Sequence, residues 1–582
     1  MLRGIFQTKK LDDIMAAAEG GPSLRRELGA LQVTLLGIGA IVGAGIFATV
    51  GTAAAGDAAR LGAGPSLMLS FCLTAIVCAF TALCYAEFAA LVPISGSAYT
   101  YSYATLGELV AWIIGWDLII EYAVGNVAVA ISWANYFRTL LENLGIHFPQ
   151  WLATDYRTAA RIPGLYDSAP HLFGVPIVFN LLAAFIVALI TIVLVLGIRE
   201  SARFNAGMVI VKILVLLFFV VIALRYVTPS QMAANWHPFQ PNGWKGTFAG
   251  AAVVFFAYIG FDAVSTVAEE TRNPGRNLPI GIIASLIICT ILYIGVAAVF
   301  TGILPYGELK QRLATEQAEP LTMALDHVAP GQDWATGIVA LGSVIAHTAV
   351  LLVFQLGQPR IFFSMARDGL LPQAFAAVHP RYRTPHVTTI LTGVAVGGVA
   401  AFASIDEMVD LTNIGTLFAF VLVCIGVPIL RYTDPNRPRP FRVPFGPYLL
   451  PLLGVAACLF LMFYLPPASW WRFIGWLVLG FAIYSSYGYT RSLIGRRMGR
   501  PERTPGTLKV ASVGFLLTAV GLFTIPHHAG LGELLAQAGD AAAEDHARAL
   551  VGLALIALGL VLGIAGLFLE TGTRRSGAGA PS

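Results

Sequence analysis

Apolar runs of about twenty residues recur along the whole chain and are separated by short polar segments. Each run is long enough to cross the roughly 30 Å hydrocarbon core of a bilayer as a helix, and the alternating ten-residue strands of a membrane barrel are absent. The pattern therefore predicts an all-α polytopic membrane protein with about fourteen spans, at 31–54, 66–91, 107–140, 174–197, 203–226, 247–270, 279–303, 334–365, 387–403, 411–430, 447–465, 472–490, 507–525 and 549–570.

The composition agrees with a membrane protein. Hydrophobic residues make up 57% of the 582 residues and charged residues only 12%, about half the charged share of ordinary soluble domains. Lys and Arg concentrate in alternate loops, which places the N- and C-termini in the cytoplasm by the positive-inside rule. The six cysteines lie within predicted spans without the spacing of a metal site, so no metal or cofactor is expected. The basic loop 431–447, with Arg437-Pro438-Arg439-Pro440, is short and lies between two spans, which argues against nucleic-acid binding.

The first span is interrupted by glycine. Residues 37–49 carry four glycines in a segment that should be a continuous helix, and unwound backbone is tolerated in a membrane only where it lines a protein cavity. A half-helix starting after Gly43-Ala44-Gly45 would direct free amides and its positive dipole end at an anion such as a carboxylate. The alternative is close helix packing, because Gly39 and Gly43 have the GxxxG spacing.

A second interruption lies in span six, where Gly260 and Asp262 follow an aromatic run. Breaks in spans one and six occupy equivalent positions if the chain repeats after five spans, and an odd number of spans per repeat inverts the second copy. We therefore expect a cytoplasmic segment at 1–30, inverted five-span repeats at 31–226 and 247–430, spans eleven and twelve at 447–490, spans thirteen and fourteen at 507–570, and a cytoplasmic tail at 571–582.

Four motifs resemble those of the amino acid–polyamine–organocation superfamily, and within it the cationic amino acid transporters and their bacterial relatives: Gly39–Phe47, Phe255–Pro274, Gln358–Arg360 and Met365–Pro372. The resemblance covers roughly residues 28–490. It implies a LeuT-type core of ten spans with the substrate held between the two breaks. It also implies a set of substrate-contacting residues: Ile41, Gly43, Ala44 and Gly45 for the carboxylate, Phe256, Ala257 and Ile259 for the ammonium, and Phe354 and Gln355 on span eight.

Phe256 would lie over the substrate as a gate, although a plain packing role is the alternative.

Ionisable residues within membrane spans cost free energy to insert, so each is expected to have a bonding partner or a function. The resemblance makes Lys212 the proton-coupling residue of proton-driven members, since burial of a lysine favours its neutral form; the alternative is a permanently charged residue bonded to carbonyls of span one. Glu121 and Asp262 are the expected pocket or gate acids, and each could instead be structural. His347 could relay protons, but a hydrogen-bonded packing role is favoured.

These features predict a secondary active amino acid permease in the cell (inner) membrane that works by alternating access and takes up neutral amino acids with protons. Span eight carries no acid near Val353–Gln355 to meet a cationic side chain. The alternatives are a sodium-independent uniporter or exchanger of cationic amino acids, and a non-transporting amino acid sensor of the same fold. The expected partners are an amino acid, protons and the lipid bilayer. The sequence does not decide whether a small single-span accessory protein binds.

Overall fold

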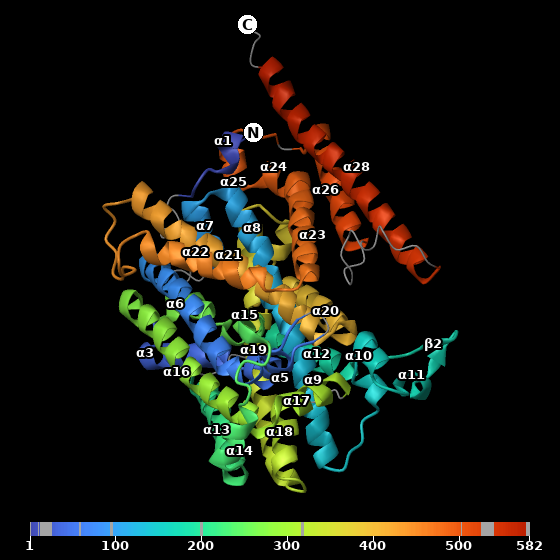
Figure 1. The fold of residues 1–582 in the computed structure, drawn as a ribbon. Helices are drawn as coiled ribbons and strands as arrows, with labels where there is room; N and C mark the ends of the chain where they lie inside the picture. The colour runs from blue at the N-terminus through green and yellow to red at the C-terminus, as the bar shows by residue number, and fades with distance from the viewer. Residues whose placement is uncertain are drawn as a thin grey trace.

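The computed structural model describes residues 2–9, 11, 26–57, 60–93, 97–197, 202–315, 319–501, 503–524 and 540–577 (Figure 1). The predicted N-terminal segment 1–30 and tail 571–582 therefore lie partly outside the described residues. The described chain is helical apart from one hairpin, β1 (His171–Leu172) with β2 (Val175–Pro176). The predicted all-α class is thereby confirmed.

Nine described stretches are long and apolar enough to cross a membrane. The first four contain η1 (Gly64–Ser66) with α6 (Leu67–Leu91), α8 (Glu108–Ile119) with η2 (Ile120–Val124) and α9 (Gly125–Asn143), α13 (Ala202–Tyr226), and α15 (Gly243–Val254) with η4 (Phe255–Tyr258) and η5 (Asp262–Glu270). The other five contain α16 (Pro274–Ile303), α19 (Asp333–Arg367), α21 (Ile405–Thr433), α26 (Gly506–Thr524) and α28 (Asp540–Gly577). Three shorter apolar helices are α3 (Ala30–Ile41), α12 (Leu181–Leu196) and α20 (His386–Phe402). The apolar helices α22 (Leu449–Phe463) and α23 (Pro467–Ile483) meet at an angle of 116°.

Short helices connect these segments or cap their ends. They are α1 (Leu2–Ile5), α4 (Ala44–Phe47), α5 (Thr49–Ala55), α7 (Ser97–Thr105), η3 (Gln150–Leu152), α10 (Tyr156–Arg161), α11 (Leu165–Ser168), α14 (Pro229–Asn235), α17 (Tyr306–Thr315), α18 (Pro320–Val328), η6 (Gln373–Ala376), η7 (Tyr484–Gly488), α24 (Tyr489–Arg491) and α25 (Leu493–Arg497). We call the face with α1 and α25 the cytoplasmic face and the face with α14 and α17 the outer face, following the charge pattern.

Span four is shorter than its hydropathy predicts. Residues 174–180 were expected to be helical, but part of them forms the hairpin, and α12 begins only after Asn180. The Asn180 side chain accepts a hydrogen bond of 3.0 Å from the Ala183 amide. This is the N-cap arrangement that satisfies an otherwise unpaired helix amide, and it fixes the start of the helix inside an apolar run.

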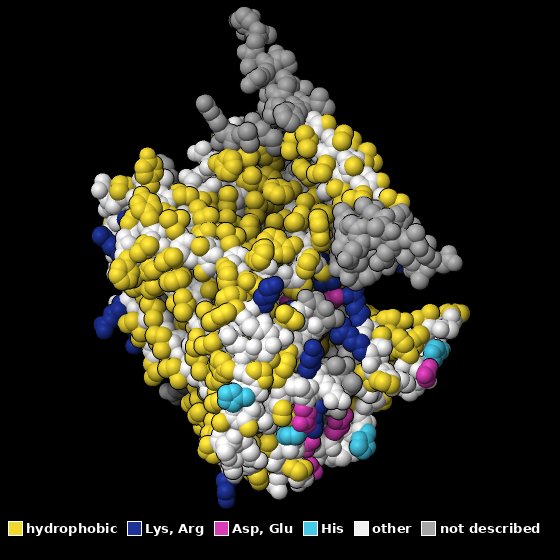
Figure 2. All heavy atoms as spheres, in the orientation of Figure 1, with side chains coloured by type: hydrophobic (Ala, Val, Ile, Leu, Met, Phe, Trp, Pro, Cys, Tyr) yellow, Lys and Arg dark blue, Asp and Glu magenta, His cyan; other side chains and the backbone are white. Residues whose placement is uncertain are grey.

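The surface in Figure 2 is mostly hydrophobic, as expected of a protein that faces lipid, and the Asp, Glu and His side chains visible in this view lie in its lower half. The helices α26 and α28 form a separate pair beside the main body (Figure 1). Their contact is lined by glycine: a Cβ on Gly514 would lie 2.8 Å from the Gly563 Cα, and one on Gly521 would lie 2.6 Å from the Gly552 carbonyl oxygen. Close backbone approach of this kind drives helix pairing in membranes.

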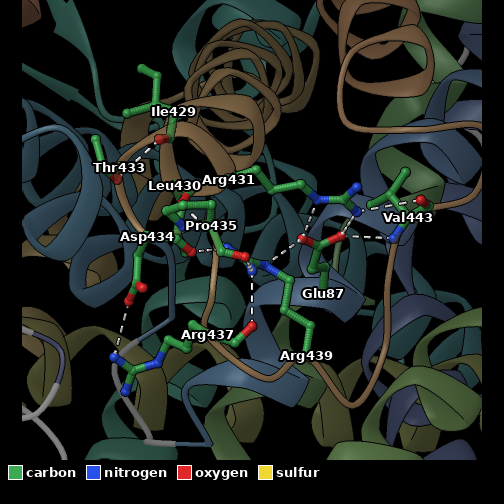
Figure 3. Close-up of polar contacts among 10 residues, drawn as sticks. All are labelled: Glu87, Ile429, Leu430, Arg431, Thr433, Asp434, Pro435, Arg437, Arg439 and Val443. Carbon is green, nitrogen blue, oxygen red and sulfur yellow. Dashed lines mark hydrogen bonds and ion pairs between the residues drawn. The ribbon is translucent and has the colours of Figure 1, made fainter.

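Glu87, at the cytoplasmic end of α6, fixes the connector 434–448 between α21 and α22 (Figure 3). Its carboxylate is bonded by Arg431 of α21, with Nε at 2.9 Å, and by the Val443 amide at 2.7 Å. The guanidinium of Arg439 lies 3.5 Å away. Because Glu87 is 3% exposed, these contacts compensate the cost of burying its charge.

We expect Glu87→Gln to destabilise the protein by about 3–5 kcal/mol, because it leaves the buried Arg439 side chain and the partly buried Arg431 side chain without their carboxylate. Thermal unfolding of the purified protein measures this effect. Glu142→Gln is the matched control, since the Glu142 side chain is 45% exposed and lies 3.6 Å from Arg138, and ion pairs with an exposed carboxylate contribute about 0–1 kcal/mol. An equal loss of stability in both variants would contradict the structural role of Glu87.

Candidate functional site

The two interrupted segments lie against each other. α3 ends at Ile41 and α4 begins at Ala44, with Gly43 between them in an extended conformation. In the other segment, helix η4 (Phe255–Tyr258) is followed by Gly260 with φ of 122°, a region that only glycine adopts readily. A Cβ on Gly260 would lie 2.8 Å from the Ala40 carbonyl oxygen. Backbone from the two breaks is therefore in direct contact.

Gly45 shows how closely the two breaks meet. A Cβ on Gly45 would lie 2.6 Å from the Ala257 Cβ and 2.7 Å from its nitrogen. Ala44 and Gly45 are the first residues of α4, so their amides have no intrahelical acceptor. At the end of α3 the backbone offers oxygens instead, and the Ile41 oxygen accepts a bond of 3.0 Å from Tyr293. Donors and acceptors thus meet within a few residues, as a zwitterionic ligand requires.

The predicted residues of span six are buried at the same place. Phe256 is 5% exposed, and Ala257 and Ile259 are less so. Tyr258 points away and donates a bond of 3.1 Å to the Phe71 oxygen of α6. Phe256 therefore lies within the protein and does not face lipid, which agrees with both the gate and the packing interpretations.

Lys212 of α13 reaches the break in span one. Its Nζ donates bonds of 2.6 Å to the Gly39 oxygen and 3.0 Å to the Val42 oxygen. The carbonyl groups at a helix C-terminus carry partial negative charge, which stabilises an ammonium. The side chain is fully buried, so any change in its charge alters the contact between α13 and the unwound segment. This contact is compatible with both interpretations of Lys212, proton coupling and a permanent charge.

Glu121 and Asp262 are neighbours across the site. Glu121 lies in the π-helical turn η2 (Ile120–Val124) within α8–α9, and its carboxyl group interacts with that of Asp262. Asp262 also accepts a bond of 3.2 Å from the Gly260 amide and one of 3.4 Å from Tyr122. Asp262 therefore stabilises the turn of the second break. π-Helical turns are frequent at functional sites.

Span eight places its two predicted residues in opposite directions. Phe354 packs edge-on against Tyr122, with ring centroids 5.8 Å apart. Gln355 instead donates a bond of 2.5 Å to Thr191 of α12 and accepts one of 3.3 Å from Asn126. Phe354 thus lies near the breaks, whereas Gln355 joins α19 to α9 and α12.

His347 is held in the packing arrangement. Its Nε2 lies 2.7 Å from the Ser132 oxygen and its Nδ1 lies 2.6 Å from the Ser343 carbonyl oxygen. The ring also packs against Phe47 and Tyr136. Both ring nitrogens are bonded to neighbouring residues, so the side chain links α9 to α19. This arrangement supports the packing interpretation of His347.

A cavity of about 110 Å³ lies on the cytoplasmic side of the breaks. Tyr122, Val353 and Gly357 line its inner end, while Arg360 and Ser364 lie a turn or two further towards the cytoplasmic end of α19. The wall residue Tyr99 donates a bond of 2.8 Å to Asp368, which also pairs with Lys9 at 3.0 Å. No sequence pattern marks Tyr99 or Tyr122 as site residues, because aromatic residues are common throughout the spans.

An ion-pair cluster lies on the outer side of the site. Arg60, in the loop after α5, bonds both oxygens of Asp410 on α21 at 2.7 and 2.8 Å and also bonds Asp57 at 2.7 Å. Burial lowers the pKa of Arg60, but Asp410 and Asp57 more than offset this, so the pKa is raised above its ordinary value. Next to this cluster, Thr52 of α5 donates a bond of 3.0 Å to Asp406.

We expect Asp410→Asn to favour opening on the outer side, because removing one partner of a buried pair is strongly destabilising. With a reporter cysteine at the buried position Ala53, labelling by an external membrane-impermeant maleimide should rise several-fold above the background of the native cysteines. Glu142→Gln in the same background is the control and should leave labelling unchanged. Equal labelling in all three proteins would show that the Arg60–Asp410 pair does not hold the outer side closed.

Cytoplasmic ends of the two interrupted spans are joined as well. Leu28, just before α3, forms a parallel bridge with Thr271, just after η5 (Asp262–Glu270). The amides of Glu27 and Leu28 donate to the Glu270 oxygen at 2.9 and 3.0 Å, and the Arg272 amide donates to the Leu28 oxygen at 2.8 Å. These backbone bonds connect the two half-helices that face the cytoplasm.

Comparison with known proteins agrees with this geometry. A family model described as amino acid permease matches residues 28–483. The chain is similar to the branched-chain amino acid permease BcaP of Bacillus subtilis, with 46% identity over 84% of this chain and 99% of BcaP. It is also similar to the methylthioribose transporter of Bacillus subtilis, with 43% identity over 85% and 100%, and to the vacuolar cationic amino acid transporter 4 of Arabidopsis thaliana, with 36% identity over 75% and 68%. The chain therefore belongs to the amino acid permease family of the amino acid–polyamine–organocation superfamily, as its motifs predicted.

Proposed function

We propose that the chain is a secondary active transporter, and not an enzyme, that takes up neutral amino acids with protons by alternating access. Contact between the two interrupted spans, with Lys212 bonded to the carbonyls of the first, is the observation that carries the proposal. Amides at Ala44 and Gly45 would bind the substrate carboxylate. Backbone oxygens around Phe256, Ala257 and Ile259 would bind its ammonium, and a zwitterion is complementary to such a pair of helix ends.

In the proposed architecture, fourteen spans cross the inner membrane and both termini are cytoplasmic. The nine long apolar stretches, the three shorter helices and the two helices that meet at 116° together supply that number. Residues 31–226 and 247–430 would form the inverted repeats, and the glycine-paired helices α26 and α28 would be an addition outside them. The cavity lined by Val353 and Arg360 would be the route to the cytoplasm.

A neutral, apolar side chain fits the surroundings best. Phe354 and Val353 lie on span eight beside the breaks. The carboxyl groups of Glu121 and Asp262 interact with each other, and Asp262 also bonds the turn at Gly260. The relative BcaP is named for branched-chain amino acids, which supports leucine, isoleucine and valine as first candidates. Relatives named cationic amino acid transporters are less similar in sequence.

The similarity to a methylthioribose transporter supports a second candidate substrate, a neutral thiosugar. Such a ligand has no carboxylate and no ammonium, so it would use the site through its hydroxyl groups. The amino acid would bind the backbone at Gly45 and Ala257 through its charged groups, whereas the thiosugar would bind the same backbone through hydroxyl groups.

Uptake into proteoliposomes that contain the purified full chain tests the proposal. With an inward proton gradient and no sodium, labelled isoleucine should accumulate and excess unlabelled isoleucine should compete better than excess arginine. Stronger competition by arginine would favour a cationic substrate, and accumulation of methylthioribose in place of isoleucine would favour the thiosugar. Saturable binding of isoleucine without accumulation would identify a sensor. If a small accessory protein is required, uptake should be observed in native membranes but not in proteoliposomes that contain the purified chain alone.

A further inference from the structure

A second cavity lies far from the substrate site, on the lipid-facing side of α16. It is a groove of about 440 Å³ between the first half of α16 and the connector 434–448. Its apolar lining consists mainly of Pro279, Ile280, Ile283 and Ile287 from α16 and Pro440 and Phe441 from the connector. Ile280 and Ile287 are 39% and 54% exposed, so in a bilayer this surface meets lipid.

The connector wall of the groove is held in place. Pro440 and Phe441 lie between Arg439 and Val443, both of which contact the buried carboxylate of Glu87 (Figure 3). At the cytoplasmic end the connector meets α16, since a Cβ on Gly275 would lie 2.7 Å from the Pro440 Cβ. The groove is therefore built from two fixed walls that meet at that end.

The length of the groove matches one half of a bilayer. Its lining on α16 runs from Gly275 to Ile287, and a helix rises about 18 Å between these two residues. Half of the hydrocarbon core is about 15 Å. A ligand that fills this groove must therefore be an amphiphile, with its polar end at the cytoplasmic boundary and an apolar chain towards the membrane centre.

Charge at the groove favours an anionic head group. Arg276 lines the groove where α16 begins and is exposed, and exposed Arg442 directly follows Phe441. Among the described residues no carboxylate lines the groove. Two nearby acids are already paired, Glu87 with Arg431 and Asp434 with Arg437. Basic pockets between membrane helices on the cytoplasmic side are suited to lipid phosphates.

We propose that this groove is a binding site for an anionic phospholipid of the cytoplasmic leaflet, with its phosphate at Arg276 and Arg442 and one acyl chain along Ile280, Ile283 and Ile287. The proposal rests on the membrane orientation proposed above but not on the substrate or on proton coupling. Arg276 follows the turn 271–274 that links span six to α16, so the bound lipid would border the cytoplasmic half of the transport site.

Native mass spectrometry of the full chain in detergent tests the proposal, with dioleoyl phosphatidylglycerol and dioleoyl phosphatidylcholine as probes. The wild type should retain phosphatidylglycerol in preference to phosphatidylcholine. Arg276→Gln with Arg442→Gln should weaken the binding of phosphatidylglycerol about tenfold or more, because each basic residue near a lipid phosphate strengthens binding several-fold. Arg381→Gln with Arg496→Gln, which changes two other exposed cytoplasmic arginines, should bind as the wild type does.

The acyl chain is tested separately. Ile283→Trp fills the groove and should reduce phosphatidylglycerol binding with both arginines intact, whereas Ile291→Trp, on an exposed face of α16 outside the groove, should not. Glycerol phosphate should fail to displace the lipid. Unchanged binding in the double arginine variant, equal binding in the two tryptophan variants, or displacement by glycerol phosphate would each overturn the proposal. Because the readout is binding, failure of transport leaves the result unaffected.

Discussion

Lys212→Ala should abolish accumulation of amino acid driven by a proton gradient. In the structure the Lys212 ammonium bonds the oxygens of Gly39 and Val42, at the end of the first half-helix of span one. Loss of the proton would weaken both bonds. A state that keeps these bonds therefore favours the protonated lysine, and a state that breaks them does not, so the proton affinity of Lys212 can differ between the outward-open and inward-open states. Without the amine, the two states no longer differ in proton affinity at this position, and the gradient cannot drive the cycle.

The measurement is uptake of labelled isoleucine into proteoliposomes with and without an imposed inward proton gradient. Exchange of internal for external isoleucine should be retained in Lys212→Ala, because the proposed carboxylate and ammonium contacts lie at other residues. Lys245→Ala, in the exposed first turn of α15, is the control and should accumulate substrate normally. If Lys212→Ala still concentrates isoleucine under the gradient, the lysine has a structural role and Glu121 or Asp262 must be tested for coupling.

Gly45→Val should nearly eliminate uptake while the protein is still produced. A side chain at Gly45 meets the backbone and Cβ of Ala257, and backbone cannot rotate away as the end of a flexible side chain can. Overpacking costs about 1–3 kcal/mol, which weakens substrate affinity by roughly five- to 150-fold if the cost falls on substrate binding. The added bulk separates the two breaks where the carboxylate and ammonium would bind.

Binding of isoleucine, measured by the shift of thermal unfolding with ligand, distinguishes this effect from loss of folding. The variant should unfold cooperatively and show little stabilisation by isoleucine. Gly398→Val is the matched control, because a Cβ on Gly398 of α20 meets nothing within 4 Å. Normal isoleucine binding by Gly45→Val would exclude the breaks as the substrate site.

Local sequence signals predicted the helix breaks well. Clustered glycines in span one, and Gly260 with Asp262 in span six, stand out because spans contain few residues that interrupt helices or carry charge. Lys212 was noticed for the same reason, and its partners lie at the predicted break. The start of α12 was placed too early, because hydropathy does not detect an N-cap such as Asn180 within an apolar run.

Features that depend on distant contacts could not be predicted. Arg60 and Asp410 are 350 positions apart, and either could have been an ordinary exposed charge. Gln355 points towards α12, where it bonds Thr191, and Phe354 points towards Tyr122. The sequence of span eight alone does not show where α12 lies, so these directions could not be predicted from it. Glu87 lies near the end of the predicted span 66–91, and its partners in α21 and the connector are 344 or more positions away in the sequence, so no local pattern identifies them.

The backbone bridge between Leu28 and Thr271 limits how the cytoplasmic side can open. If the half-helix of span one swung outward alone, the amides of Glu27, Leu28 and Arg272 would lose their acceptors, and water would have to replace each bond. If both half-helices tilt together, no bond is lost. The lower-energy movement therefore keeps α3 and η5 together. In the transport cycle proposed above, a single hinge, and not two independent ones, would govern exit to the cytoplasm.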